Sequence, residues 1–270
     1  MGVKSNKFEH LINLGANLAG TAAGTAMGFL VAGPPGAVLG GTIGSTCTDV
    51  LKAIGEEVID KRLAMSERQL LRSGAVYSFS IVKFKKNLEE QKPLSESFFK
   101  SYEPIERSTA EEMLEHVIIK AKDECEEKKI KFLGNLYGNA AFAIVLSKNT
   151  LNQLVNLVSD LSYRQICILA MIKNINDHNL RQEDYRGGGI QFPIESQHVL
   201  QEIFALESMN LIKCKQQNSG DSEVFFGITD IALGRLYLQP LGENLYNLLN
   251  LNEIVEDDIL NLVNSLRAIC

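Results

Sequence analysis

The feature that most constrains this chain is a long uncharged segment near its N-terminus. Between His10 and Asp49 no residue carries a charge. A continuous helix of this length would extend roughly 57 Å, almost twice the ~30 Å hydrocarbon thickness of a bilayer. A Gly-Pro-Pro-Gly run at 33–36 interrupts the segment, and such a run is typical of a tight turn. The segment therefore predicts a helical hairpin, which we assign to residues 1–60.

Small residues recur at every fourth position along both arms of this hairpin. On a helix, residues four apart share one face, so the repeat forms a flat groove of the kind that lets helices approach closely in a membrane. The repeat, which we call the glycine zipper, consists of Ala16, Gly20, Gly24, Gly28, Ala32, Gly36, Gly40, Gly44 and Thr48. Its six glycines from Gly20 to Gly44 are the expected contacts between hairpins.

Two further stripes run beside the zipper in the first arm. One is polar and consists of Asn13, Asn17, Thr21 and Thr25. The other is apolar and consists of Leu14, Leu18, Ala22, Ala26 and Leu30. A helix that lines a water-filled ring needs a polar stripe, whereas a lone membrane anchor does not. Large apolar residues are sparse and glycine is a weak helix former in water, so we expect insertion only after several hairpins associate.

Two other interpretations of the hairpin stay open at this stage. It fits a permanent, tightly packed membrane anchor, and it also fits a soluble Gly/Ala-rich helical pair in a protein core. A phosphate-binding loop is disfavoured, because the chain lacks the G-x-x-x-x-G-K-[ST] pattern and no strand precedes the glycines.

After the hairpin, hydrophobic periodicity predicts a helical module over residues 61–160. Capping-box signals start helices at Ser66, with Gln69, and at Ser108, with Glu111. Ser162, with Gln165, starts a helix just beyond the module in the same way. The expected helices cover 49–91, with a second start at 66, then 109–128, 129–146, 150–160 and 162–174.

The last part, residues 161–270, changes character. A helix at 194–209 is followed by two short β runs around an Asn-Ser-Gly-Asp turn, and further helices are expected over 229–270. This order predicts a winged-helix-like domain, so the whole chain is expected to be mainly α. A DNA reader draws most of its affinity from basic contacts to phosphates. Residues 150–270 hold 15 acidic and 8 basic residues, so a protein-binding or oligomerisation role is favoured over nucleic acid.

The sequence offers no constellation typical of an enzyme, a metal site or a cofactor site. The cysteines are five, far apart and without a C-x-x-C pair, which favours reduced thiols in the cytoplasm. None of the four histidines has a metal-ligand spacing, and His116 is expected on a solvated helix face. The dense charge run at 123–129 is likewise interpreted as solvated helix surface. The triple glycine at 187–189 has the composition of an anion cradle, but a flexible loop is the favoured interpretation.

Three stretches in the body of the chain resemble a family of bacterial proteins. They are SERQLLRSGAVYSFSIVKF, AEEMLEHVIIKAKDECEEKKIKFLGNLYGNAAF and LSYRQICILAMI. Members of this family combine a glycine-rich N-terminus with a helical module and a C-terminal winged helix. The resemblance covers roughly residues 15–240, and its motifs describe helix packing and carry no chemistry.

The resemblance implies a role in abortive infection against phage. Proteins of this kind include membrane-disrupting effectors that oligomerise on an infection signal, such as a phage structural protein. The chain is accordingly expected to be a pore-forming toxin in the bacterial cytoplasm that moves to the inner membrane when activated. Its expected partners are the lipid bilayer and further copies of itself. The rival expectations are a winged-helix DNA-binding regulator or adaptor, and a constitutive membrane-tethered scaffold.

Overall fold

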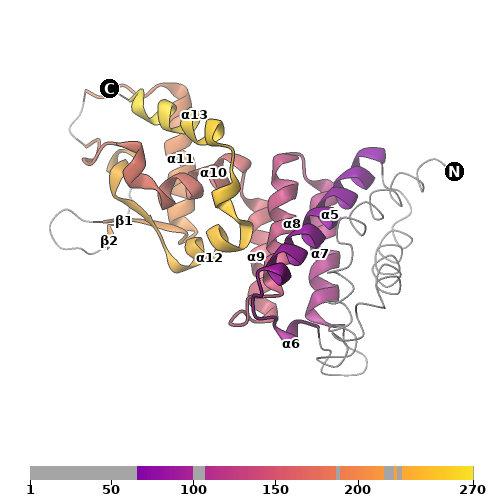
Figure 1. The fold of residues 1–270 in the computed structure, drawn as a ribbon. Helices are drawn as coiled ribbons and strands as arrows, with labels where there is room; N and C mark the ends of the chain where they lie inside the picture. Colours follow the sequence, from indigo (N-terminus) through magenta and orange to yellow (C-terminus); the bar gives the residue numbers. More distant parts are fainter. Residues whose placement is uncertain (1–65, 100–106, 187–188, 216–221, 224–226, 270) are drawn as a thin grey trace. The chain divides into compact units, whose positions relative to one another are not determined.

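The computed structural model describes residues 66–99, 107–186, 189–215, 222–223 and 227–269 (Figure 1). The chain divides into two compact units, residues 1–160 and 161–270. The described residues are mainly helical and include one small antiparallel sheet, as the sequence predicts. The described part of residues 1–160 is called the helical unit, and the described part of residues 161–270 is called the C-terminal unit.

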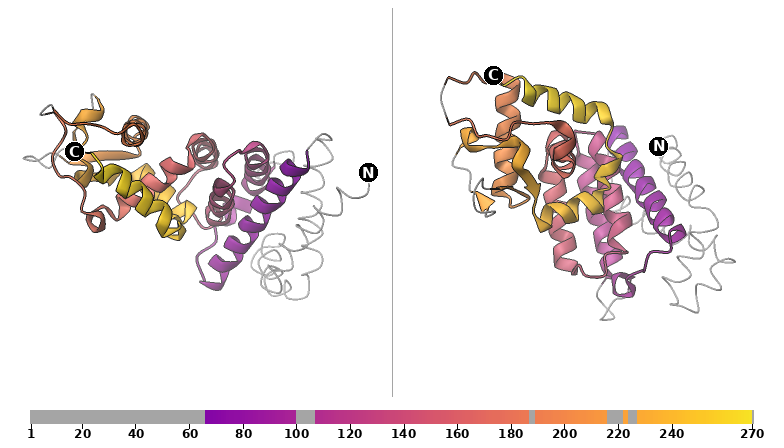
Figure 2. Two further views of the ribbon diagram at one scale, coloured as in Figure 1. Left: turned by 90° about the horizontal axis from the view of Figure 1, so that it is seen from above. Right: turned by 60° about the vertical axis from the view of Figure 1, so that its left-hand side comes forward.

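The helical unit is a bundle of packed helices (Figure 1; Figure 2). Helix α5 packs against α7 and α8, and α9 packs against α7 and α8. The element bounds are α5 Glu67–Glu89, α6 Glu96–Phe99, α7 Thr109–Asp123, α8 Lys128–Ala140 and α9 Lys148–Asp160.

Capping boxes start the helices where the sequence predicts them. The Ser66 N–H donates to Gln69 Oε1 at 2.9 Å, at the start of α5. At the start of α7, the Ser108 N–H donates to Glu111 Oε2 at 2.8 Å while its side chain caps the first turn. Each contact satisfies backbone donors that the first helical turn leaves free.

Two predicted helices end earlier in the structure than in the sequence analysis. The helix predicted over 109–128 stops at Asp123, because Glu124 adopts an extended backbone. The helix predicted over 129–146 stops at Ala140, and α9 begins at Lys148, where the Ser147 side chain caps it by accepting from the Thr150 N–H at 3.2 Å. The helical spacing of apolar residues in the sequence continues across both breaks, so it does not reveal where the helices end. The ends are visible only in the backbone hydrogen bonds of the structure.

Helices α5 and α8 approach closely because α8 presents two glycines to α5. A Cβ added at Gly134 would lie 2.9 Å from the Val76 carbonyl oxygen. A Cβ added at Gly138 would lie 2.8 Å from the Ser80 carbonyl oxygen and 2.7 Å from Lys83 Cβ. The two backbones are therefore in contact at both glycines, in a small-xxx-small arrangement.

The same interface buries several polar side chains of α5. The Asn87 amide donates to the Gly138 carbonyl at 3.1 Å and to Asn139 Oδ1 at 2.7 Å. Ser73 Oγ and Tyr77 Oη are also buried, and neither finds a hydrogen-bond partner among the residues described. Burial raises the pKa of Tyr77, so its hydroxyl stays protonated.

The C-terminal unit packs helices around a small sheet. Helix α10 lies at its centre, with a run of fully buried residues from Ile166 to Ile172 broken only by slightly exposed Cys167 and Ala170. The element bounds are α10 Tyr163–Lys173, η1 Ile175–His178, α11 Ile194–Ser208, β1 Ile212–Lys215, β2 Ser222–Glu223, η2 Ile228–Asp230, η3 Leu233–Arg235, β3 Leu236–Leu238, α12 Pro240–Leu249, η4 Leu251–Glu253 and α13 Glu256–Arg267.

The sheet has the strand order β2-β1-β3, and both pairings are antiparallel. The β1–β2 pairing, with Cys214 opposite Glu223, confirms the predicted pair of β runs. Strand β3 is a correction to the prediction of helices alone over residues 229–270. In the structure, Leu238 pairs with Ile212, and both side chains are buried.

Candidate functional site

The residues predicted to act in membranes lie outside the described part of the chain. This holds for the polar stripe and for the zipper glycines, namely Asn13, Asn17, Thr21, Thr25, Gly20, Gly24, Gly28, Gly36, Gly40 and Gly44. Their role remains a prediction from sequence. The structure describes the two units that follow this segment in the chain. Any site seen in the structure must therefore lie in one of these units.

Neither a metal cluster nor a membrane span stands out in the part of the chain that is described. No group of three or more His, Cys, Asp or Glu side chains there is arranged to hold a metal ion. No single described helix is both long and apolar enough to cross a bilayer. Helices α9 and α10 taken together do have the length and apolar composition of a membrane span.

The charge run at 123–129 is only in part the solvated helix surface that its pattern predicts. Asp123, Glu126, Glu127 and Lys128 are exposed, as expected, but residues 124–127 are not helical, and Lys129 is buried in an ordered polar junction. The side chains of Lys129 and Glu124 are only 3% and 9% exposed, and Lys129 Nζ lies 2.6 Å from Glu124 Oε2. Lys129 Nζ also donates to the Ser159 carbonyl at 2.8 Å. That carbonyl belongs to the last turn of α9, where backbone acceptors lack helical partners and favour a cation.

The same junction holds the first turns of α5. Arg68 donates to both carboxylate oxygens of Glu127, at 2.6 and 2.7 Å, and Arg72 donates to Glu127 at 3.2 Å. The hydrogen bonds from the two arginines lower the pKa of Glu127. Gln69 adds a contact to Asp123 at 2.9 Å. The junction therefore ties together the helix that follows the N-terminal segment and the helix that precedes the C-terminal unit.

His116 lies on a partly exposed helix face, where it also contacts the neighbouring helix. Its Nε2 lies 3.1 Å from Asn156 Oδ1, so it joins α7 to α9. The contact is a packing interaction between neighbouring helices. It gives His116 a structural role and does not indicate chemistry.

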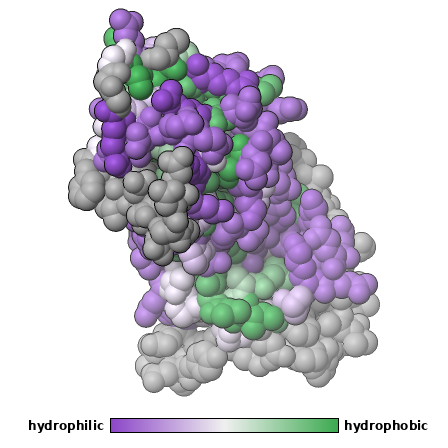
Figure 3. Space-filling view, turned by 90° about the vertical axis from the view of Figure 1, so that its left-hand side faces the viewer, coloured by the Kyte–Doolittle hydropathy of each residue, from purple (hydrophilic) through white to green (hydrophobic). Residues whose placement is uncertain are grey.

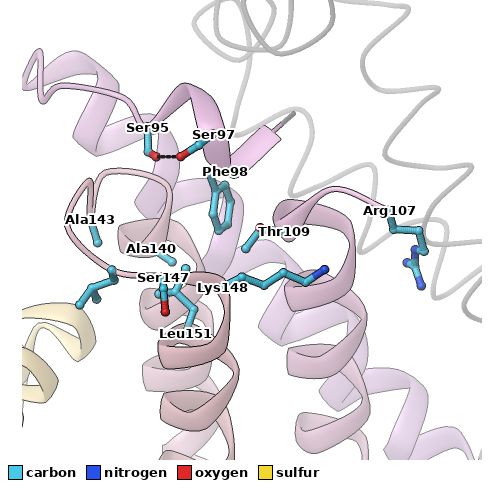
Figure 4. A pocket seen from close by; sticks show the side chains of 11 residues that line it. Ser95, Ser97, Phe98, Arg107, Thr109, Ala140, Ala143, Ser147, Lys148 and Leu151 are labelled. Carbon is cyan, nitrogen blue, oxygen red and sulfur yellow. Dashed lines mark hydrogen bonds between the residues drawn. The ribbon is translucent and has the colours of Figure 1, made fainter. Parts of the chain in front are cut away.

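The helical unit contains a cavity of about 310 Å³ between α6, the start of α7, the end of α8 and the start of α9 (Figure 4). Its wall combines hydroxyls such as Ser97 and Thr109 with apolar side chains such as Phe98. The two basic residues at its rim are already paired, Lys148 with Glu112 at 2.9 Å and Arg107 with Glu115. In Figure 4 the Arg107 side chain lies apart from the other labelled residues. The cavity therefore offers no uncompensated charge to a ligand.

In the C-terminal unit, the helix that would read DNA in a winged helix is acidic and its neighbouring bases are engaged. Helix α11 contains Glu195, Glu202 and Glu207 and has no Lys or Arg. Glu207 pairs with Lys213 of β1, and the Lys215 ammonium lies 5.6 Å from the centre of the Tyr237 ring. Lys213 is therefore held in an ion pair, whereas Lys215 stays exposed.

The C-terminal unit also has a cavity of about 200 Å³ between α10, α11 and α13. Tyr163 Oη, on its wall, donates to Asp258 Oδ2 at 2.8 Å. Burial and this hydrogen bond both raise the pKa of Tyr163. Arg164 reaches from α10 to two acids of α11, lying 2.5 Å from Glu195 and 2.6 Å from Glu202. No local sequence pattern predicts this cavity, because its wall comes from three helices far apart in the chain.

On the face drawn in Figure 3, the described surface is largely hydrophilic, and hydrophobic residues reach it in separate small groups. The large hydrophobic side chains that are exposed are Phe79, Val82, Ile144 and Val145 in the helical unit, and Ile194, Met209, Val255 and Leu260 in the C-terminal unit.

Comparison of the chain with protein-family models, with curated proteins and with solved structures finds no match.

Proposed function

We propose that this protein is an anti-phage effector that oligomerises on an infection trigger and disrupts the membrane with its glycine-zipper hairpin. The observation that carries the proposal is the segment 11–48, which joins a complete absence of charge to a small residue at every fourth position. Small residues let helix backbones approach closely, and packing then replaces the hydrophobic drive that is absent between helices in lipid.

The composition of the segment favours insertion that depends on assembly. With few large apolar side chains, a single hairpin gains little from lipid. When several copies gather, the local concentration of hairpins rises and zipper contacts add to the free energy of insertion. The polar stripe of Asn13, Asn17, Thr21 and Thr25 would then face water inside the ring.

We assign trigger recognition to the C-terminal unit and regard it as winged-helix-like. Support comes from the order of α10, α11 and the β1–β2 hairpin. The acids of α11 and the ion pair between Glu207 and Lys213 favour a protein partner over nucleic acid. The resemblance to membrane-disrupting abortive-infection effectors supports a phage structural protein as that partner.

The proposal is tested by expressing the chain in bacteria with and without residues 11–48 during phage challenge. We expect the full chain to collapse the membrane potential and stop growth, and the truncated chain to do neither. Equal depolarisation by both chains would remove the hairpin from the mechanism. Recovery of the full chain in membranes before any challenge would favour a constitutive scaffold, and salt-dependent retardation of plasmid DNA would favour a regulator.

A further inference from the structure

Helix α5 carries an apolar stripe that its described neighbours leave partly open. The helix lies at one edge of the helical unit, with α7 and α8 packed on one side of it (Figure 2). Phe79 and Val82, three residues apart, are 39% and 45% exposed. Ala75, one turn before Phe79, is half-buried. Apolar residues at alternating spacings of four and three form the seam through which helices pack, so this stripe suits one more helix.

The chain itself supplies an uncharged segment close to this stripe. Residues 11–48 carry no charge, whereas residues 49–65, which join them to α5, include seven charged side chains. An uncharged segment leaves apolar surface in water unless something covers it. Of the residues that lead into α5, the segment 11–48 therefore gains most from an apolar partner.

The lengths of the two elements match. Helix α5 has 23 residues and a length of about 34 Å. The first arm of the expected hairpin, residues 11–32, would be about 33 Å long as a helix. Residues 49–65 span about 25 Å even when fully helical, which is enough for the arm to fold back along α5.

A second copy of the chain is a weaker candidate for this stripe. A stable interface between separate molecules buries roughly 1,200 Å² or more, and α5 exposes only two large apolar side chains here. A segment tethered to the same helix needs much less contact area, because its effective concentration at the stripe is high.

We propose that residues 11–48 dock on this stripe of α5 before activation and leave it when copies of the chain assemble. The inference rests on the proposed function, because it describes the resting state of the same hairpin. In a single molecule, Phe79 and Val82 bury apolar side chains of the first arm, such as Leu14 and Leu18. In an assembly, zipper contacts between hairpins compete with this docking and shift the population to the released state.

Photo-crosslinking of the full chain in solution tests the contact directly. p-Benzoylphenylalanine in place of Phe79 keeps an aromatic side chain at the stripe, and irradiation joins it to the residues beside it. We expect crosslinks to residues 11–48, identified by mass spectrometry of the digested protein. The same group in place of Leu260, which is 43% exposed on α13, should give none.

Two results of this experiment would overturn the docking. One is the absence of crosslinks from position 79 to residues 11–48, whether the group reaches residues 49–65, a second copy or only the bundle itself. The other is equal crosslinking to residues 11–48 from positions 79 and 260, because the contact would then not be specific to α5.

Variants of the stripe test its consequence for the membrane. Phe79→Ser and Val82→Ser should each lower the protein concentration that half-empties vesicles of phosphatidylethanolamine and phosphatidylglycerol about tenfold, because loss of the apolar contact favours the released hairpin. Leu260→Ser removes a similarly exposed apolar side chain from α13 and should leave this concentration unchanged. An unchanged concentration for both stripe variants would contradict a docked resting state.

The two measurements separate this inference from the proposed function. The crosslink forms in solution and does not require insertion into lipid. Crosslinks from position 79 to residues 11–48 without any dye release would overturn the proposed function and leave the docking standing. Dye release that requires residues 11–48, without such crosslinks, would overturn the docking alone.

Discussion

Replacement of Gly138 by alanine is expected to lower the free energy of unfolding of the helical unit by about 2 kcal/mol. Helix propensity alone predicts the opposite sign, since alanine stabilises a helix by about 1 kcal/mol relative to glycine. The added Cβ would lie 2.8 Å from the Ser80 carbonyl oxygen and 2.7 Å from Lys83 Cβ, so α5 and α8 must move apart. The buried contacts of Asn87 with α8 would weaken with them.

Urea unfolding followed by circular dichroism measures this effect. Gly227→Ala, in the C-terminal unit, is the control, because a Cβ at Gly227 meets no described residue within 4 Å and its φ of −170° suits any residue. The control should change stability by no more than about 0.5 kcal/mol. A more stable Gly138→Ala protein would show that the two helices do not approach as closely as described.

Replacement of Lys129 by methionine is expected to cost about 3 kcal/mol of stability. The change removes the 2.6 Å ion-pair partner of the Glu124 carboxylate, which is 9% exposed and keeps only the Glu126 N–H as a neutral donor at 2.9 Å. It also removes the donor to the Ser159 carbonyl. A buried charge without a partner is far more costly than the loss of an exposed ion pair. The double variant Glu124→Leu with Lys129→Met should therefore recover most of the lost stability.

The control for this prediction is Lys148→Met. Lys148 pairs with Glu112 at 2.9 Å, but the two side chains are 37% and 35% exposed. Its replacement should cost less than about 1 kcal/mol. Equal losses from Lys129→Met and Lys148→Met in urea unfolding would mean that the junction at 123–129 is not a buried polar contact.

Local signals in the sequence predicted the helix starts well. The capping boxes at Ser66, Ser108 and Ser162 need only residues three apart, and all three form in the structure. The β1–β2 hairpin was also predicted locally. Strand β3 was not, because its three residues become a strand only through pairing with β1.

Long-range contacts explain what the sequence did not predict. The burial of Lys129 depends on the end of α9, thirty residues away, so a pattern of charges along one helix suggested solvent instead. The spacing of Gly134 and Gly138 was visible, and it carries the same small-xxx-small signal as the N-terminal zipper. The small-xxx-small spacing predicts close packing of two helices, but it does not distinguish a pair of helices in lipid from a pair in a protein core. The cavity of the C-terminal unit joins residues about ninety positions apart, such as Tyr163 and Asp258.

Dye release from vesicles of phosphatidylethanolamine and phosphatidylglycerol, measured against protein concentration, shows directly whether associated hairpins disrupt a membrane. The account predicts release that rises steeply with concentration, because hairpins insert only when several associate. Gly24→Val should abolish release, whereas Ala26→Val, which adds a similar bulk on the apolar stripe, should retain it. Equal release by the natural chain and Gly24→Val would contradict the glycine zipper as the membrane-active element.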